Sequence, residues 1–283
     1  MAVIPSRAEL LAAVRLSRLP GVGAAGFKAL VTMHGRPSAA LAAWLAVLPE
    51  RRPSLPWVSR RKAATEEGVA AAERFLAEGG LGWHWGGVGY PGRLADVSEP
   101  PPVLFGRGIL PVAPMVAVVG TRRADAVGLS LAERLGCALA GAGRVVVSGG
   151  AAGIDAAAHR GALAAGGLTV AVLGCGVVVV FPRAHADLFA EIAARGALLS
   201  ELLPGTAPRP GFFPTRNRIV AGLAEETIVM QAPARSGALL TAEHARRAGR
   251  RVRVVVPPVD GPPWAGNRSL LDAGAEPLAP EDL

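Results

Sequence analysis

Residues 116–128, 145–162 and 169–176 read VAVVGTRRADAVG, VVVSGGAAGIDAAAHRGA and TVAVLGCG, and these three stretches decide the fold. Each begins with a short apolar run rich in valine and continues into glycine, and alanine- and leucine-rich segments of helical length separate them. Continuous apolar runs that alternate with helices are typical of a parallel sheet that is buried on both faces. We therefore predict an α/β protein with a mostly parallel sheet and helices on both faces.

The remaining sequence predicts a small helical domain and a linker before this sheet. Residues 1–80 place apolar residues at helical spacing, and we expect a small all-helical N-terminal domain that is SAM-like or helix–hairpin–helix-like. Its stretch LPGVGAAGFKAL fits either a phosphate-binding hairpin or an ordinary αα-hairpin. Residues 81–114 are dense in glycine and proline, which predicts an ordered linker. We expect residues 115–283 to form the sheet domain, and we expect no C-terminal winged-helix domain.

Further strands and helices follow the three defining stretches. Short apolar runs bounded by turn residues predict strands, and apolar residues at a spacing of three and four predict helices. We expect a helix that opens at Thr215 and, in addition, strands at 197–200, 227–231 and 252–256 and helices at 184–194 and 238–248.

Composition limits the class of protein. The chain has 283 residues and a mean hydropathy of +0.37, but Gly, Arg or Pro interrupts every apolar run before the length of about 18 residues that a membrane span needs. The N-terminus lacks the apolar core of a signal peptide, so we expect a cytoplasmic protein with no membrane contact. Cys137 and Cys175 lie far apart in apolar segments, which predicts neither a disulfide framework nor a metal site. The net charge of +8 favours a polyanionic partner.

The turns after the strands do not carry the motifs of common enzymes. A dinucleotide-binding protein needs GxGxxG after its first strand, whereas this chain has Gly120-Thr121-Arg122-Arg123. Walker A and GxSxG motifs are also missing. Asp155 and His159 are four residues apart on one predicted helix face, and we interpret them as a helix-start carboxylate and a structural histidine rather than a catalytic pair. We therefore expect no enzyme, no cofactor and no metal.

Polar and small residues gather where the strands end and the helices begin. Glycines allow a backbone to approach a phosphate, N-terminal amides and hydroxyls bind it, and arginines neutralise it. Because the carboxyl ends of parallel strands share one edge of a Rossmann-like sheet, these residues predict an extended anion-binding groove. The residues predicted to form this groove are Gly120, Thr121, Arg122, Ser148, Gly149, Gly150, Gly153, Gly174, Arg216, Asn217, Arg218, Gln231, Arg235, Ser236, Gly237 and Thr241.

Several long motifs resemble those of the DNA-processing protein A (DprA/Smf) family. They run from about Tyr90 to Ala275 and read VAVVGTRRADAVG, SGGAAGIDAAAHRGAL, TVAVLGCG followed by FP, FPTRNRIVAGLA and RSGALLTAEHA. The resemblance implies single-stranded DNA binding, homodimerisation and loading of RecA recombinase onto DNA taken up in natural transformation. It maps the family's basic positions onto Arg122, Arg216-Asn217-Arg218 and Arg235. The chain departs from the family pattern with GTR for GSR, SGGAAGID for SGLALGID and Gly266-Asn267-Arg268 for GCH.

Two hypotheses from different classes follow. The first is a non-enzymatic single-stranded DNA-binding protein that protects incoming DNA and loads RecA. The alternative is a Rossmann-like nucleotide-binding or nucleotide-processing protein, in which the same residues hold one small phosphorylated ligand. The PGGxGT-x-x-E motif of nucleoside-monophosphate phosphoribohydrolases is missing from the chain, but glycine-rich turns alone leave this alternative open.

Overall fold

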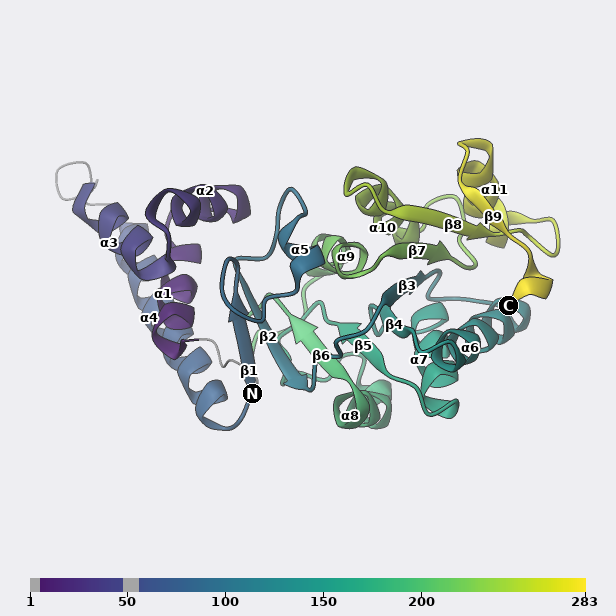
Figure 1. Cartoon of the computed structure of the whole chain (residues 1–283), viewed down its shortest axis with the longest axis horizontal. Coiled ribbons are helices and arrows are strands. Elements are labelled where there is room, and N and C mark those ends of the chain that lie inside the picture. The colour runs from purple at the N-terminus through teal and green to yellow at the C-terminus, as the bar shows by residue number, and fades with distance from the viewer. Residues whose placement is uncertain (1–5, 48–55) are drawn as a thin grey trace.

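A nine-stranded sheet forms the centre of the molecule (Figure 1). The computed structural model describes residues 6–47 and 56–283. The strand order is β1-β2-β6-β5-β4-β3-β7-β8-β9. All neighbours from β6 onward in this order pair in parallel, whereas β1 pairs antiparallel with β2 and β2 pairs antiparallel with β6. The mostly parallel α/β sheet that the sequence predicts is confirmed. The strands are β1 (Leu81–His84), β2 (Val103–Gly108), β3 (Met115–Val119), β4 (Val145–Ser148), β5 (Thr169–Val172), β6 (Ala197–Ser200), β7 (Glu226–Val229), β8 (Arg251–Val255) and β9 (Glu276–Leu278).

Helices cover both faces of the sheet because the central strands are apolar on both sides. Val116 and Val118 pack against α6, α7 and Trp264, whereas Ala117 and Val119 face the side of α9 and α10. This alternation is the period of two that a strand imposes. In the sheet domain the helices are α5 (Gly92–Ala95), α6 (Ala126–Gly141), α7 (Ile154–Ala164), α8 (Ala186–Arg195), α9 (Phe212–Leu223), α10 (Gly237–Arg247) and α11 (Ala265–Asp272), with 3₁₀ turns η1 (Arg183–His185), η2 (Pro262–Trp264) and η3 (Pro280–Asp282).

Four helices precede the sheet and lie at one end of the molecule, beside β1 and β2 (Figure 1). They are α1 (Arg7–Ser17), α2 (Ala24–His34), α3 (Pro37–Val47) and α4 (Pro56–Ala77). Phe27 and Phe75 pack in one core with Phe105 of β2, so the helices are anchored to the sheet. Residues 1–5 and 48–55 of the predicted helical domain lie outside the described residues. The α1–α2 turn is present, and its contact with phosphate stays a prediction.

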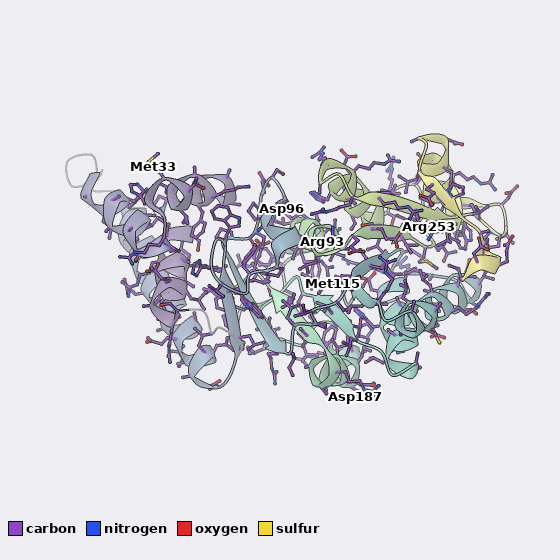
Figure 2. The ribbon with its side chains drawn as sticks, in the orientation of Figure 1. Met33, Arg93, Asp96, Met115, Asp187 and Arg253 are labelled. Atoms are coloured by element: carbon purple, nitrogen blue, oxygen red, sulfur yellow. The ribbon has the colours of Figure 1, made fainter. Side chains whose placement is uncertain are left out.

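Figure 2 shows the side chains on the ribbon, and some large apolar ones are exposed to solvent. Met33, at the outer side of α2, is 76% exposed. No helix within residues 6–47 and 56–283 combines the length and the apolar character that a membrane crossing requires.

The segment 81–114, which the sequence predicts to be a linker, contributes two strands to the sheet. Strand β1 pairs with β2, and β2 pairs in turn with β6. The strands were missed because both contain glycine, which weakens a strand pattern. The structure explains the glycine of β2, since a Cβ at Gly106 would meet the ring of Trp83 and the side chain of Leu199. The Tyr90 hydroxyl donates to the carbonyl of Pro101 at 2.8 Å and fixes the connection between the two strands.

Two further differences concern the last third of the chain. Helix α9 begins at Phe212, three residues before the predicted start at Thr215. Pro214 is tolerated there because the first-turn amides of a helix have no partner within the helix. The short edge strand β9, which includes Pro277, was not predicted, since proline is confined to edges and strand ends.

Candidate nucleic-acid interface

A pocket of about 300 Å³ opens at the carboxyl ends of β3, β4 and β7. After β3 the chain moves through β4, β5 and β6 in one direction and then returns to β7 on the other side of β3. Ligands of open α/β sheets bind in the crevice at such a reversal of strand order. The loops β3–α6, β4–α7 and β7–α10 and the helix α9 supply the walls. The predicted edge of the sheet therefore does form a pocket.

Most of the predicted DNA-binding residues come together in the wall of this pocket. They are Gly120, Thr121, Arg122, Gly149, Arg216, Asn217, Arg235, Ser236, Gly237 and Thr241. The sequence missed Arg123 and Asp155, although each is adjacent to, or within, a motif that was singled out. The other lining residues are Val119, Ala151, Val220, Pro233 and Ala238.

Three arginines supply the exposed charge of the site. Arg122, Arg123 and Arg235 are all exposed and line the pocket. None of them forms an ion pair with an acidic residue in the part of the chain that the structure describes. Exposed guanidinium groups without an acidic partner are suited to phosphate, which they bind in a bidentate manner.

Arg216 is buried, and its place in the pocket differs from the prediction. It is 4% exposed, and its guanidinium donates to the carbonyl of Val172. Its Nε atom has no hydrogen-bond partner among the described residues. Burial lowers the pKa of Arg216 to about 10, although the nearby Asp155 carboxyl acts in the opposite direction. Arg216 therefore forms the floor of the pocket rather than its rim.

Arg218 does not belong to the site, which corrects the sequence-based prediction. Its guanidinium donates to both carboxylate oxygens of Glu201, at 3.1 Å to Oε1. The Arg218 side chain is only 11% exposed, so the pair stabilises the contact between α9 and the end of β6. The helix periodicity could not show this, because Glu201 comes from another segment.

Ser148 and Gln231 are predicted site residues that instead hold the loops in place. The Ser148 hydroxyl donates to the carbonyl of Val118 at 2.6 Å and is fully buried. Gln231 is also fully buried, and its Nε2 donates to Asp125 Oδ2 at 2.6 Å while its Oε1 accepts from the Asp125 amide. Neither side chain lines the pocket. Their role is to fix the β3–α6 loop that carries Arg122.

The remaining predicted glycines, Gly150, Gly153 and Gly174, do not line the pocket. They allow neighbouring segments to pack closely, because they have no side chain. Gly153 has φ +78°, and a Cβ on it would meet the carbonyl of Thr121 and the backbone of Arg122. The Ile154 amide donates to that same Thr121 carbonyl at 3.1 Å. Gly150 has φ +66°, and Gly174 lies against the ring of Phe213. Gly153 thus allows the start of α7 to approach the Arg122 loop.

Asp155 and His159 have separate hydrogen-bond partners in the structure. His159 Nδ1 lies 2.6 Å from the Thr169 hydroxyl, and that hydroxyl donates to the carbonyl of Val146. Burial lowers the pKa of His159 to about 3, so the imidazole is neutral. In the described part of the chain, no three His, Cys, Asp or Glu side chains gather closely enough to hold a metal ion.

An aromatic pair that the sequence did not single out borders the charged pocket. The ring centres of Phe213 and Phe181 are 5.6 Å apart, and Phe181 is 43% exposed. The Arg122 guanidinium lies 5.1 Å from the centre of the Phe213 ring. The two consecutive phenylalanines in RPGFFPTRNR were the available signal, but their proline-rich surroundings predicted only a loop.

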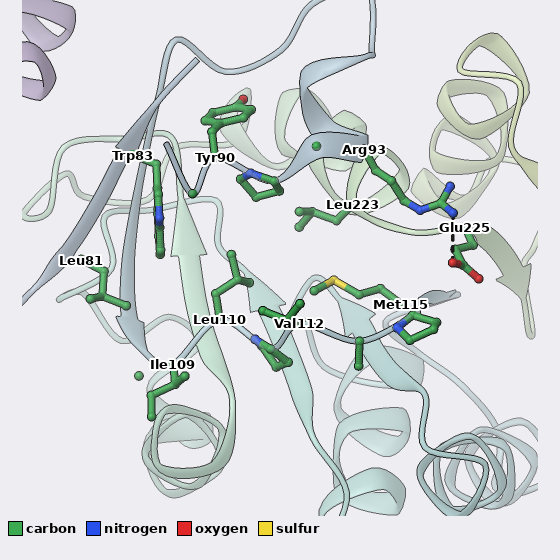
Figure 3. A pocket seen from close by; sticks show the side chains of 17 residues that line it. Leu81, Trp83, Tyr90, Arg93, Ile109, Leu110, Val112, Met115, Leu223 and Glu225 are labelled. Carbon is green, nitrogen blue, oxygen red and sulfur yellow. Dashed lines mark hydrogen bonds and ion pairs between the residues drawn. The ribbon is translucent and has the colours of Figure 1, made fainter. Parts of the chain in front are cut away.

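A larger cavity of about 690 Å³ lies at the opposite edge of the sheet (Figure 3). Trp83, Tyr90 and Met115 are among its mostly apolar lining residues. Its charged residues, Arg93 and Glu225, pair with each other at 2.9 Å. The cavity is therefore apolar and offers no free cation to a phosphate, so the smaller pocket is the candidate site.

The fold and the smaller pocket define a Rossmann-like α/β protein with an arginine-lined pocket at the carboxyl edge of its sheet. The family model described as DNA recombination-mediator protein A matches residues 84–283, and this chain belongs to that family. The predicted resemblance to the DNA-processing protein A (DprA/Smf) family is confirmed.

Curated relatives are similar over about two thirds of the chain. Protein Smf of Synechocystis is 41% identical over 68% of this chain and 50% of its own length. The putative DNA processing protein DprA of Mycobacterium tuberculosis is 45% identical over 65% of this chain and 48% of its own. The chain thus spans about half the length of these relatives. DNA processing protein DprA of Bacillus subtilis is 36% identical over 69% of this chain and 67% of its own.

Solved structures extend the similarity to the whole chain. DNA processing protein A from Streptococcus pneumoniae has a TM-score of 0.81 and 28% identity, over 99% of this chain and 97% of its own. The protein from Helicobacter pylori, described in terms of its single-stranded DNA binding mode, has a TM-score of 0.63 and 28% identity, over 70% of this chain and 90% of its own.

Proposed function

We propose that this chain is a non-enzymatic protein that binds single-stranded DNA through the pocket at the carboxyl edge of its sheet. The observation that carries the proposal is the set of exposed arginines, Arg122, Arg123 and Arg235, which have no acidic partner among the described residues and surround one pocket. A polyanion gains a charge-assisted contact from each of them without breaking an existing ion pair. The similarity to the Helicobacter pylori protein supports the choice of single-stranded DNA.

The aromatic pair favours a single strand over a duplex. Phe181 is 43% exposed and stacks at an angle on Phe213, next to Arg122. Aromatic side chains beside a basic groove bind the faces of unpaired bases, which a duplex keeps stacked inside. Such binding tolerates any base sequence, since every base has a π-face. We therefore propose that phosphates lie on the arginines while one or more bases stack at Phe181 and Phe213.

The membership in the DNA recombination-mediator protein A family supports a more specific biological role. We propose that the protein protects incoming DNA during natural transformation and loads RecA recombinase onto it. A homodimer in the cytoplasm is part of the same proposal. These roles are those of full-length proteins, and the chain spans about half the length of the Synechocystis and Mycobacterium tuberculosis relatives.

Fluorescence anisotropy titrations test the DNA-binding proposal directly. We expect binding to labelled oligo-dT and weaker binding to a duplex of equal length. Affinity for the single strand should fall steeply with salt, because each neutralised phosphate releases counterions. A 5′-labelled poly-A strand should bind with a similar salt slope. Equal affinity for single and double strands, or no binding at low salt, contradicts the proposal.

A further inference from the structure

The loop between β4 and α7 has its anion-binding amides already in use. In Rossmann-like folds the free backbone amides at such a helix start hold the phosphate of a small ligand. Here the amides of Gly149 and Ala151 both donate to Asp155 Oδ2, at 3.1 and 3.3 Å. Asp155 lines the pocket and is only 7% exposed. Its carboxylate therefore stands where a ligand anion would otherwise be bound.

A buried arginine completes this arrangement. A Cβ at Gly149 would collide with the Arg216 guanidinium and with Asp155 Oδ2, so both groups press against this one glycine. Arg216 is 4% exposed and retains an unpartnered Nε at the pocket floor. The Asp155 carboxylate thus lies near the positive charge of Arg216, while the Nε donor of Arg216 has no hydrogen-bond partner among the described residues.

The pair is not explained by stability alone. Burial raises the pKa of the Asp155 carboxyl, although Arg216 and the two amides act in the opposite direction. Burial also lowers the pKa of Arg216 to about 10. Both groups are therefore shifted toward their neutral forms, which indicates that desolvation outweighs their mutual attraction. Two opposite charges buried close together are weak evidence for stabilisation, and a role in the site accounts better for their position.

We propose that the Asp155 carboxylate is a built-in anion that occupies the phosphate position at the start of α7. It keeps free phosphate and the dianionic phosphate of mononucleotides out of this position. The phosphodiesters of a nucleic-acid strand are left to the exposed arginines Arg122, Arg123 and Arg235. This last part rests on the proposed DNA-binding function, whereas the exclusion of phosphate does not. Asp155 is therefore the residue that separates a strand-binding protein from a nucleotide-binding one with the same fold.

Chemical rescue tests the built-in anion. Asp155→Ala removes the carboxylate and frees the amides of Gly149 and Ala151 beside Arg216. We expect a lowered melting temperature that rises again with inorganic phosphate, added at constant ionic strength, because an anion that binds only the folded state stabilises it. The wild-type melting temperature should not respond. A variant that ignores phosphate, or a wild type that responds equally, overturns the proposal.

Asp125→Ala is the matched control. Asp125 also accepts a backbone amide, since its Oδ1 binds the Gly128 amide at 2.7 Å at the start of α6, but it is exposed. Asp125→Ala should lower the melting temperature, and phosphate should raise it again by less than in Asp155→Ala, because Arg216 lies beside Asp155 and not beside Asp125. An equal response in Asp125→Ala and Asp155→Ala contradicts the assignment to Asp155.

A competition experiment on the wild type needs no folding-sensitive variant. Thymidine 5′-monophosphate and its methyl ester differ by one methyl group and one negative charge. We expect the monoanionic ester to displace labelled oligo-dT about tenfold better, since the second charge of the monophosphate is repelled by Asp155. Asp155→Asn should remove that preference. A preference for the monophosphate in the wild type overturns the proposal. Failure to bind oligo-dT at all contradicts the proposed function instead, and the melting experiment with phosphate then still tests the role of Asp155.

Discussion

The guanidinium of Arg122 lies over the ring of Phe213, 5.1 Å from its centre. The β3–α6 loop and the start of α9 are therefore in contact beside the pocket. Arg122 belongs to the β3–α6 loop and Phe213 to the first turn of α9. A cation held over an aromatic face keeps a fixed orientation while its N–H groups stay available. The contact thus joins the proposed phosphate-binding and base-stacking parts of the site.

Replacing Arg122 by alanine should weaken binding to single-stranded DNA without unfolding the protein. We expect a loss of roughly 1.5–3 kcal/mol, the range for hydrogen bonds to charged groups. The slope of log affinity against log salt should become shallower by about 0.7, which corresponds to one phosphate of a single strand. Arg195→Ala is the control, since Arg195 ends α8 at the opposite edge of the sheet. An unchanged slope in Arg122→Ala contradicts the assignment.

Arg216→Ala should act mainly on stability, in contrast to Arg122→Ala. Removing the arginine leaves the Asp155 carboxylate buried without the positive charge near it, and an uncompensated buried charge costs about 3–5 kcal/mol. The double variant Asp155→Asn with Arg216→Gln should recover much of this loss, because no buried charge remains. Urea unfolding of the three proteins measures the effect. If Arg216→Ala is as stable as the wild type, the two buried charges do not interact as described.

Gly153→Ala should destabilise the protein and displace the Arg122 loop. Alanine disfavours φ +78°, and its Cβ would collide with the carbonyl of Thr121. Gly166 is a matched control, since it has φ +74° and open space around its Cα. The strain is common to both variants, so any additional loss in Gly153→Ala reports the contact with the loop. Thermal unfolding and oligo-dT titration should separate the variants, and equal behaviour contradicts the proposed packing.

The buried imidazole of His159 should make stability depend on pH. Burial, together with the charges of His185 and Arg216, lowers the pKa of His159 from 6.5 to about 3. The unfolded chain therefore binds the proton first as pH falls, and the stability present above about pH 6.5 is lost progressively toward pH 3, with at most about 1.4 kcal/mol per pH unit.

Two variants isolate this contribution. His159→Gln should flatten the decline of the free energy of unfolding between pH 6.5 and 4. Thr169→Val removes the hydrogen bond to His159 but keeps the imidazole, so it should lower stability and retain the decline. A wild-type decline that is unchanged in His159→Gln assigns the effect to another group.

The strand ends were predictable because their chemistry is local. Gly120 follows an apolar run directly, and Thr121 and Gly149 each come one residue further on. Parallel strands bring their carboxyl ends to one edge whatever the rest of the chain does. The sheet centre was predictable for the same reason, since its strands are apolar on both faces. Strands β1 and β2 were not, because their glycines are explained only by packing against other segments. Gly82 lies against Leu10 and Leu76, and Gly106 lies against the Trp83 ring.

The roles of the arginines depended on partners that are distant in the sequence. Arg216, Val220 and Leu223 recur at the spacing of one helix face, and this pattern already places Arg216 on the buried side of α9. The polar run Arg216-Asn217-Arg218 within the same helix predicted an exposed site instead. No local pattern shows that Arg218 pairs with Glu201 or that Asp155 takes the amides of its own loop.

Photo-crosslinking with a single strand that carries 5-iododeoxyuridine tests the central claim most directly. If the strand crosses the pocket at the carboxyl edge of the sheet, peptide mapping should place crosslinks at Phe181 or Phe213, which border the arginine-lined pocket. Phe213→Leu should reduce the yield at that position while the variant still binds. Crosslinks confined to Trp83 and Tyr90, in the apolar cavity at the opposite edge, would contradict the account.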